Sequence, residues 1–139
     1  MKTIKLVFIL ALLFSFICLA QSQNPASKTS TPVKIEAYYF HNTSRCVTCK
    51  AVEAEAKQDI EMLYPDLVKQ GMMSFKAFNL EEEAGRTMSK KLGVSGQTLL
   101  LVKGTKKIDI TNEGFLYART NPNKLKSIIK ARVDGLLDL

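Results

Sequence analysis

The chain has 139 residues, of which 46% are hydrophobic, and a formal net charge of +7. This length is enough for one domain with one apolar core and too short for two. The 20 basic residues are scattered, with no arginine-rich stripe and no interleaved aromatic residues, which argues against nucleic-acid binding. The charge implies at most a mild attraction to an anionic surface or partner.

The first twenty residues have the composition of an export signal. Lys2 and Lys5 form a basic start, Leu6–Ala20 is an almost unbroken apolar run, and Cys18–Ala20 offers small residues for a signal peptidase. We therefore expect residues 1–20 to be a signal peptide, which makes the protein periplasmic or secreted. The alternatives are a transmembrane anchor and a lipoprotein signal ending at Cys18, and either would tether the N terminus to a membrane.

A linker is expected between this signal and the folded domain. Residues 21–32 are polar, rich in Ser and Thr, and bracketed by Pro25 and Pro32, whereas residues 33–139 alternate between apolar and polar positions. Removal of the signal lowers the net charge to near +5 and leaves Cys46 and Cys49 as the two thiols. A single close pair of cysteines does not staple a mini-protein, so the domain must be held by its apolar core.

The first half of the domain is expected to form a strand, two helical segments and a second strand. Val33–Phe40 is a β-rich run that predicts a central strand. The helix after the cysteines has an apolar stripe, with the charged residues mostly outside it. The stripe is Cys49, Val52, Ala56, Ile60 and Leu63, and the charged residues are Glu53, Glu55, Lys57 and Asp59. Pro65 breaks this helix, Gly71 closes its second piece, and Met72–Phe78 reads as a buried strand.

The second half continues with a helix capped by Asn79, whose first turn carries Glu81–Glu83. Its predicted inner stripe is Ala84, Met88 and Leu92. Thr98–Val102 is an apolar strand, and Ile108–Thr111 alternates like an antiparallel strand at the sheet edge.

A final helix is expected to start at Asn121-Pro122, with an inner stripe of Leu125, Ile129, Val133 and Leu136. The order of elements predicts an α/β fold, a three-layer sandwich in which a mixed central sheet has helices on both faces.

Cys46 and Cys49 stand between the first predicted strand and the helix that follows it. Two thiols at this spacing close a readily reversible disulfide when they lie on the first turn of a helix. Later, a glycine-containing turn at 93–97 enters the apolar strand 98–102. This combination resembles the thioredoxin superfamily over roughly residues 33–136. The resemblance implies that Cys46 is the nucleophilic cysteine and Cys49 the resolving one.

The chain departs from the pattern of that superfamily at three positions. Gln97 stands where the family usually has a cis-proline that faces the disulfide. Arg45 replaces the aromatic residue before the first cysteine, and Phe40 replaces the buried acid of thioredoxin itself. The resemblance is therefore to a thioredoxin-like protein and not to a housekeeping thioredoxin. Gly96 and Gln97 are the expected substrate-binding residues, with an altered specificity.

Three further residues are candidate auxiliaries of the cysteines: Arg45, His41 and Lys50. The positive end of the helix dipole and the charge of Arg45 should both favour the thiolate of Cys46. His41 could pass a proton to Cys49, although a loop histidine bonded to the backbone is the preferred interpretation.

Two polar motifs have a structural interpretation that we prefer. Asn42-Thr43-Ser44 matches a glycosylation sequon, but its place beside the cysteines favours an active-site loop. Glu81–Glu83 could be read as a metal cluster, but acids at a helix start that stabilise its dipole are the simpler interpretation.

The sequence thus predicts an exported thiol–disulfide oxidoreductase of the reductase or isomerase type. It would act as a monomer on protein disulfides or thiols, with a membrane or extracytoplasmic redox partner, and its redox-active Cys46–Cys49 disulfide would need no other cofactor. The alternative is that Cys46, Cys49 and His41 bind a soft metal such as copper or zinc.

Overall fold

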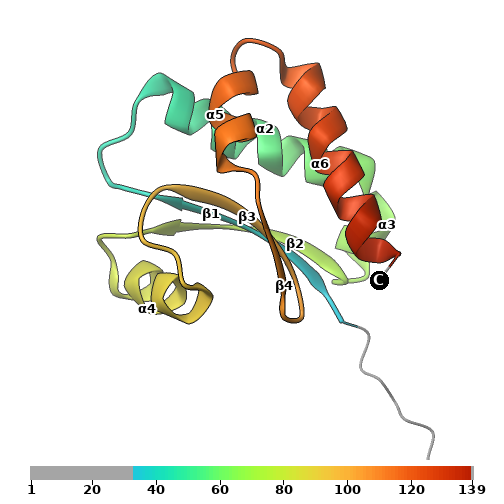
Figure 1. Ribbon diagram of the computed structural model, residues 1–139, viewed down its shortest axis with the longest axis horizontal. Coiled ribbons are helices and arrows are strands. Elements are labelled where there is room, and N and C mark those ends of the chain that lie inside the picture. Colours follow the sequence, from blue (N-terminus) through green and yellow to red (C-terminus); the bar gives the residue numbers. More distant parts are fainter. Residues whose placement is uncertain (1–32, 139) are drawn as a thin grey trace, which may run out of the picture. The chain divides into compact units, whose positions relative to one another are not determined.

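A mixed sheet of strand order β2-β1-β3-β4 organises the part of the chain that the computed structural model describes, residues 33–138 (Figure 1). The strands are β1 (Ile35–His41), β2 (Met73–Asn79), β3 (Thr98–Lys103) and β4 (Lys106–Asp109). β1 pairs in parallel with β2 and antiparallel with β3, and β3 pairs antiparallel with β4. The predicted signal peptide and linker, residues 1–32, lie outside the described residues.

Helices cover both faces of this sheet (Figure 1). On one face lie α2 (Val47–Leu63), α3 (Pro65–Lys69), α5 (Thr111–Tyr117) and α6 (Pro122–Leu137), and on the other lies α4 (Glu83–Leu92). The expected α/β class, three layers with a mixed central sheet, is confirmed, and the arrangement is compatible with a thioredoxin-like fold. None of the helices between residues 33 and 138 is both long and apolar enough to cross a membrane.

The alternation of side chains along β1 divides the interior into two cores. Ile35, Ala37 and Tyr39 pack in the core beneath α2 and α6, whereas Tyr38 and Phe40 pack in the smaller core against α4. All five side chains are buried because β1 has a strand on each side and helices above and below it. β1 is thus the central strand that the sequence predicts.

β2 is less buried than expected. It lies at the edge of the sheet, and Met73 is its one buried residue, so the prediction of a buried strand is wrong. β3, by contrast, buries its apolar run from Leu99 to Val102, as expected.

The apolar stripe of α2 is confirmed at Cys49, Val52, Ala56 and Ile60, all of which are buried. Its break is confirmed as well, because α2 ends at Leu63 and α3 begins at Pro65. Asp59, expected outside the stripe, is instead buried, with 3% of its surface exposed. α2 packs against both α6 and the sheet elements, so its buried face is wider than one stripe.

α4 begins later than predicted, at Glu83, because Asn79 closes a turn and does not cap the helix. Its side-chain oxygen accepts a hydrogen bond from the N–H of Glu81 at 3.0 Å. Ala84 is exposed and Gly85 is buried, which corrects the predicted inner stripe. A Cβ atom at Gly85 would lie 1.8 Å from the carbonyl oxygen of Asn79, so the helix packs here at a distance that glycine alone permits.

α5 was not expected. Thr111, predicted to end the edge strand, is the first residue of this helix, and its N–H donates to the carboxylate of Asp109 at 2.9 Å.

The last helix agrees with its prediction. The side chain of Asn121 accepts a hydrogen bond from the N–H of Lys124 at the start of α6, and all four residues of the expected stripe are buried.

Burial of Asp59 should make stability depend on pH. Burial raises the pKa of Asp59 from 3.8 to about 6, although the charge of Lys126 opposes this, and Oδ2 has no hydrogen-bond partner among the described residues. The native state therefore binds this proton more tightly than the unfolded state does. The stability that the protonated form contributes is present below about pH 4 and is lost as the pH rises through about 6.

We expect Asp59→Asn to raise the free energy of unfolding at pH 8 by about 1–2 kcal/mol, because it removes a buried charge without a partner, and to change it little at pH 4. Urea denaturation at both pH values measures the difference. Glu61→Gln, an exposed position on the same helix, is the control and should show no such gain. A gain of equal size at both pH values would contradict the assignment to ionisation.

Candidate functional site

Cys46 lies at the N-terminal end of α2, one residue before the first helical residue. The helix starts at the end of the sheet where β1 ends, and the loop 42–45 joins the two elements (Figure 1). The backbone of Cys46 is extended (φ −72°, ψ 167°), and its Sγ accepts a hydrogen bond from the N–H of Cys49 at 3.3 Å. A sulfur atom thus occupies the capping position that a Ser, Asp or Asn oxygen commonly fills.

The two thiols are adjacent and differ in exposure. Their Sγ atoms are 2.6 Å apart. Cys46 is exposed, whereas 4% of the surface of Cys49 is exposed. The predicted arrangement, with one sulfur at the helix tip and the other at the top of the buried stripe, is confirmed.

This environment moves the two pKa values in opposite directions. The hydrogen bond from the Cys49 thiol is the largest cause that lowers the pKa of Cys46, and backbone N–H groups of the first helical turn add to it. Burial is the largest cause that raises the pKa of Cys49, and its hydrogen bond to Cys46 adds to the rise. Cys46 therefore ionises first, while Cys49 keeps the shared proton.

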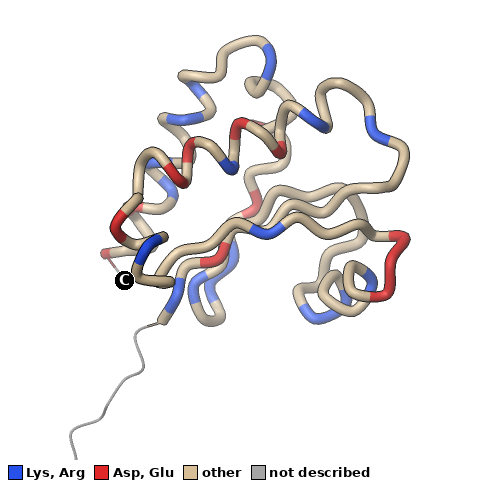
Figure 2. The backbone as a smooth tube through the Cα atoms, turned by 180° about the vertical axis from the view of Figure 1, so that it is seen from behind, with Lys and Arg blue, Asp and Glu red and all other residues tan. Residues whose placement is uncertain are grey.

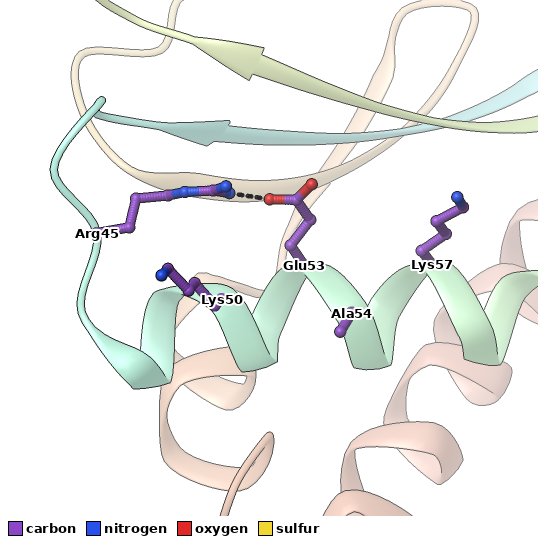
Figure 3. A pocket seen from close by; sticks show the side chains of 5 residues that line it. All are labelled: Arg45, Lys50, Glu53, Ala54 and Lys57. Atoms are coloured by element: carbon purple, nitrogen blue, oxygen red, sulfur yellow. Dashed lines mark hydrogen bonds and ion pairs between the residues drawn. The ribbon is translucent and has the colours of Figure 1, made fainter.

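Arg45 is paired with another residue and is not among the main causes of the lowered pKa of Cys46, contrary to what its sequence position suggests. Its guanidinium forms an ion pair with Glu53, one turn beyond Cys49 along α2 (Figure 3). The largest causes of the lowered pKa of Cys46 are hydrogen bonds and not the charge of Arg45. The sequence gives no signal for this pair, because Arg45 lies in the loop before α2 and Glu53 stands eight residues later on the helix.

The loop before Cys46 is held by the turn that follows β2. The carbonyl of His41 accepts a hydrogen bond from the N–H of Leu80 at 2.7 Å. The N–H of Thr43 donates to the carboxylate of Glu81 at 3.2 Å, and the side-chain amide of Asn79 donates to the hydroxyl of Thr43 at 2.8 Å. Hydrogen bonds from the side chain and the backbone of Thr43 lower the pKa of Glu81. Glu81 therefore positions the loop and is not part of the α4 helix start.

His41 is not brought together with the cysteines into a metal site. Its Nδ1 lies 3.0 Å from the carbonyl oxygen of Asn42, and its ring lies 5.9 Å from that of Tyr39. Within residues 33–138 no group of three or more His, Cys, Asp or Glu side chains is arranged to hold a metal ion. The hydrogen bond to the backbone agrees with the preferred interpretation of a loop histidine.

Gly96 and Gln97 lie at the same end of the sheet as Cys46. Thr98, the first residue of β3, pairs with Phe40 near the end of β1, so the residues just before it reach the loop region. The peptide bonds of residues 33–138 include no cis bond. The side-chain oxygen of Gln97 is buried and has no hydrogen-bond partner among the described residues.

Tyr39 is a buried polar residue near the site that the sequence predicts only as part of the sheet. Its side chain is fully buried, and its hydroxyl has no hydrogen-bond partner among the described residues. Burial raises its pKa, and the thiolates of Cys49 and Cys46 add to the rise. The phenol therefore stays neutral. The alternation of β1 could have placed it on the same side of the sheet as α2.

Lys50 is exposed on α2 and lines a hollow of about 270 Å³, one wall of which is Arg45, the residue before Cys46 (Figure 3). The other lining residues are Arg45, Glu53, Ala54 and Lys57. The sequence identifies Lys50 and Arg45 as auxiliaries of the cysteines, but not the hollow that they share.

Comparison with known proteins adds little to this description. No family model matches the chain, and no curated protein matches it. The solved structures that match include one described as "Structure of a malarial protein", which shares 17% sequence identity at a TM-score of 0.44. The match covers 70% of this chain and 96% of that one. A similarity at this level says nothing about the function of the chain.

The hydrogen bond between the thiols can be tested through the pKa of Cys46. We expect Cys49→Ala to raise this pKa toward its ordinary value, because the largest stabilising contact of the thiolate is removed. The pH dependence of iodoacetamide alkylation measures the midpoint.

Arg45→Gln and His41→Ala serve as controls for that measurement and should leave the midpoint little changed, since Arg45 is paired with Glu53 and His41 is bonded to the backbone. A midpoint that stays low in Cys49→Ala, or that rises as much in Arg45→Gln, would contradict the assignment.

Proposed function

We propose that this chain is a thioredoxin-like thiol–disulfide oxidoreductase that exchanges disulfides with protein partners. One observation carries the proposal: an exposed cysteine with a lowered pKa lies at a helix N terminus, next to a buried cysteine with a raised pKa. The thiolate is the species that attacks a disulfide, so this pair has a nucleophile and a second thiol to resolve the product.

The reaction proceeds in two exchanges. The thiolate of Cys46 attacks one sulfur of the partner disulfide, whose S–S bond breaks, and the other partner sulfur leaves as a thiolate that takes a proton from water. Cys49 then loses its proton and attacks Sγ of Cys46, which releases the second partner thiol. Two electrons pass from the cysteine pair to the partner, and a dithiol reductant must restore the pair. The reverse sequence oxidises a partner dithiol.

The electrostatics of the pair favour this order of events. In the free protein, the hydrogen bond to Cys46 and the negative charge of Cys46 both raise the pKa of Cys49. Formation of the mixed disulfide removes that charge. Burial still opposes ionisation of Cys49, but the second thiol becomes easier to deprotonate at the step in which it must react.

The loop before β3 supplies a surface for the partner. Gly96 has open space where a Cβ atom would stand, so an extended peptide could lie along the backbone of this loop.

Export belongs to the same proposal. The composition of residues 1–20 supports a signal peptide, and in an exported protein an extracytoplasmic or membrane redox partner would restore the thiols. The metal-binding alternative has less support, because residues 33–138 bring no third ligand to Cys46 and Cys49.

Insulin reduction by metal-free protein, with a dithiol as the reductant, tests the proposed activity. We expect Cys46→Ser to lower the rate to the uncatalysed level, because the attacking sulfur is lost. Cys49→Ser should instead accumulate a mixed disulfide between Cys46 and the partner, detected by its intact mass.

Ser44→Ala, an exposed position beside the cysteines, is the matched control and should retain the rate of the unmodified protein. The proposal would be overturned by an absence of exchange together with tight, stoichiometric uptake of zinc or copper(I) by the reduced protein.

A further inference from the structure

The hollow beside Cys46 has a defined place relative to the attacking sulfur. Lys50 lies one turn along α2 from Cys46, and its N–H donates to the carbonyl of Cys46 at 3.2 Å. Lys57 lies about two turns further. The hollow therefore runs along α2 from its first turn, and Figure 3 shows the side chains that line it.

The charges of the hollow do not cancel. Arg45 and Glu53 neutralise each other in their ion pair, and Figure 3 shows the guanidinium directed along the helix to the carboxylate. Lys50 and Lys57 are exposed and have no ion pair with any of residues 33–138. Two ammonium groups are thus left to face whatever enters the hollow.

Ala54 leaves space in the hollow between Lys50 and Lys57. It is exposed, and its methyl group is the smallest side chain that lines the hollow (Figure 3). The alkyl stems of the lysines supply apolar surface beside it. A longer side chain at position 54 would fill the space that a partner residue could occupy.

The positive charge is local to this side of the site. Figure 2 shows basic residues in the loop before α2 and at its start, acidic residues at the turn before α4, and residues of both signs further along α2. The acidic residues at that turn are Glu81, Glu82 and Glu83, and Glu81 is engaged with Thr43. A partner that crosses Cys46 therefore meets opposite charges on its two sides.

We propose that the hollow binds an acidic segment of the partner protein, adjacent to the disulfide that Cys46 attacks. The proposal rests on the exchange activity proposed above and adds a substrate class to it. The ammonium groups of Lys50 and Lys57, which line the hollow about two turns apart, attract an acidic segment that lies along α2, and this attraction holds the partner near the thiolate and raises its encounter rate. Because these groups are exposed, the preference is sensitive to salt.

Three synthetic peptides test this substrate class. Each carries the same intrachain disulfide, flanked by Glu, Gln or Lys, and single-turnover exchange with the reduced, metal-free protein is followed at low ionic strength. We expect the Glu peptide to react about tenfold faster than the Gln peptide and the Lys peptide to react slowest. In 0.5 M NaCl the rates for the Glu and Gln peptides should agree within about twofold.

Variants assign the preference to the hollow. Lys50→Gln combined with Lys57→Gln should remove the preference, so that the Glu and Gln peptides react at equal rates. Ala54→Glu, which fills the hollow and supplies its own carboxylate, should do the same. Lys90→Gln combined with Lys106→Gln makes the same change in net charge at exposed positions on α4 and β4, and should keep the preference.

The outcomes separate the two proposals. Equal rates for the three peptides in an active protein would overturn the acidic substrate class and leave the exchange activity standing. A preference that survives in the Lys50 and Lys57 double variant, or that is lost equally in the control variant, would also overturn it. A protein that exchanges with none of the peptides would overturn the proposed function.

Discussion

The site depends on the way in which α2 starts at the end of β1. A helix N terminus leaves backbone N–H groups without partners inside the helix, and here the sulfur of Cys46 accepts one of them. That hydrogen bond exists because the buried stripe of α2, from Cys49 to Ile60, holds the helix against the sheet. The same packing buries Cys49 and leaves Cys46 exposed. The packing of α2 in the core that it shares with the sheet and α6 thus produces both the exposure difference and the opposite pKa shifts of the thiols.

Three segments that are distant in the sequence meet around the cysteines at this end of the sheet. The loop 42–45 carries the chain to Cys46, the turn after β2 holds that loop through Asn79 and Glu81, and the residues before β3 bring Gln97 alongside. Parallel pairing of β1 with β2, and antiparallel pairing of β1 with β3, place these segments together. The polar groups at this end are largely occupied with one another, whereas the Gln97 oxygen is unpaired within the described residues.

Charge near the site has two separate uses. Hydrogen bonds at the helix start act on the thiols themselves, over distances of a few ångströms. The side-chain cations act further away, with Arg45 taken up by Glu53 and the lysines of α2 left exposed. Short-range contacts therefore lower the pKa of Cys46, and in the proposed function the exposed lysines bear on which partners approach it. These roles are physically distinct because exposed charges are screened by salt and the contacts within the helix start are not.

Local sequence patterns predicted most of the elements, the α/β class and the placement of the cysteine pair at a helix start. They could do so because apolar periodicity and helix breakers such as Pro65 act within a few residues. Features that depend on packing between distant segments were not predicted. Asp59 is buried because α6 covers α2. The helix α4 starts late because Asn79 closes a turn, and Gly85 is buried against that turn. Similarly, Arg45 was judged by its neighbour in the sequence, yet its partner is Glu53. The sequence by itself determined where a reactive thiol pair would lie. The tertiary structure decided which groups surround it, since those contacts join residues whose spacing carries no local signal.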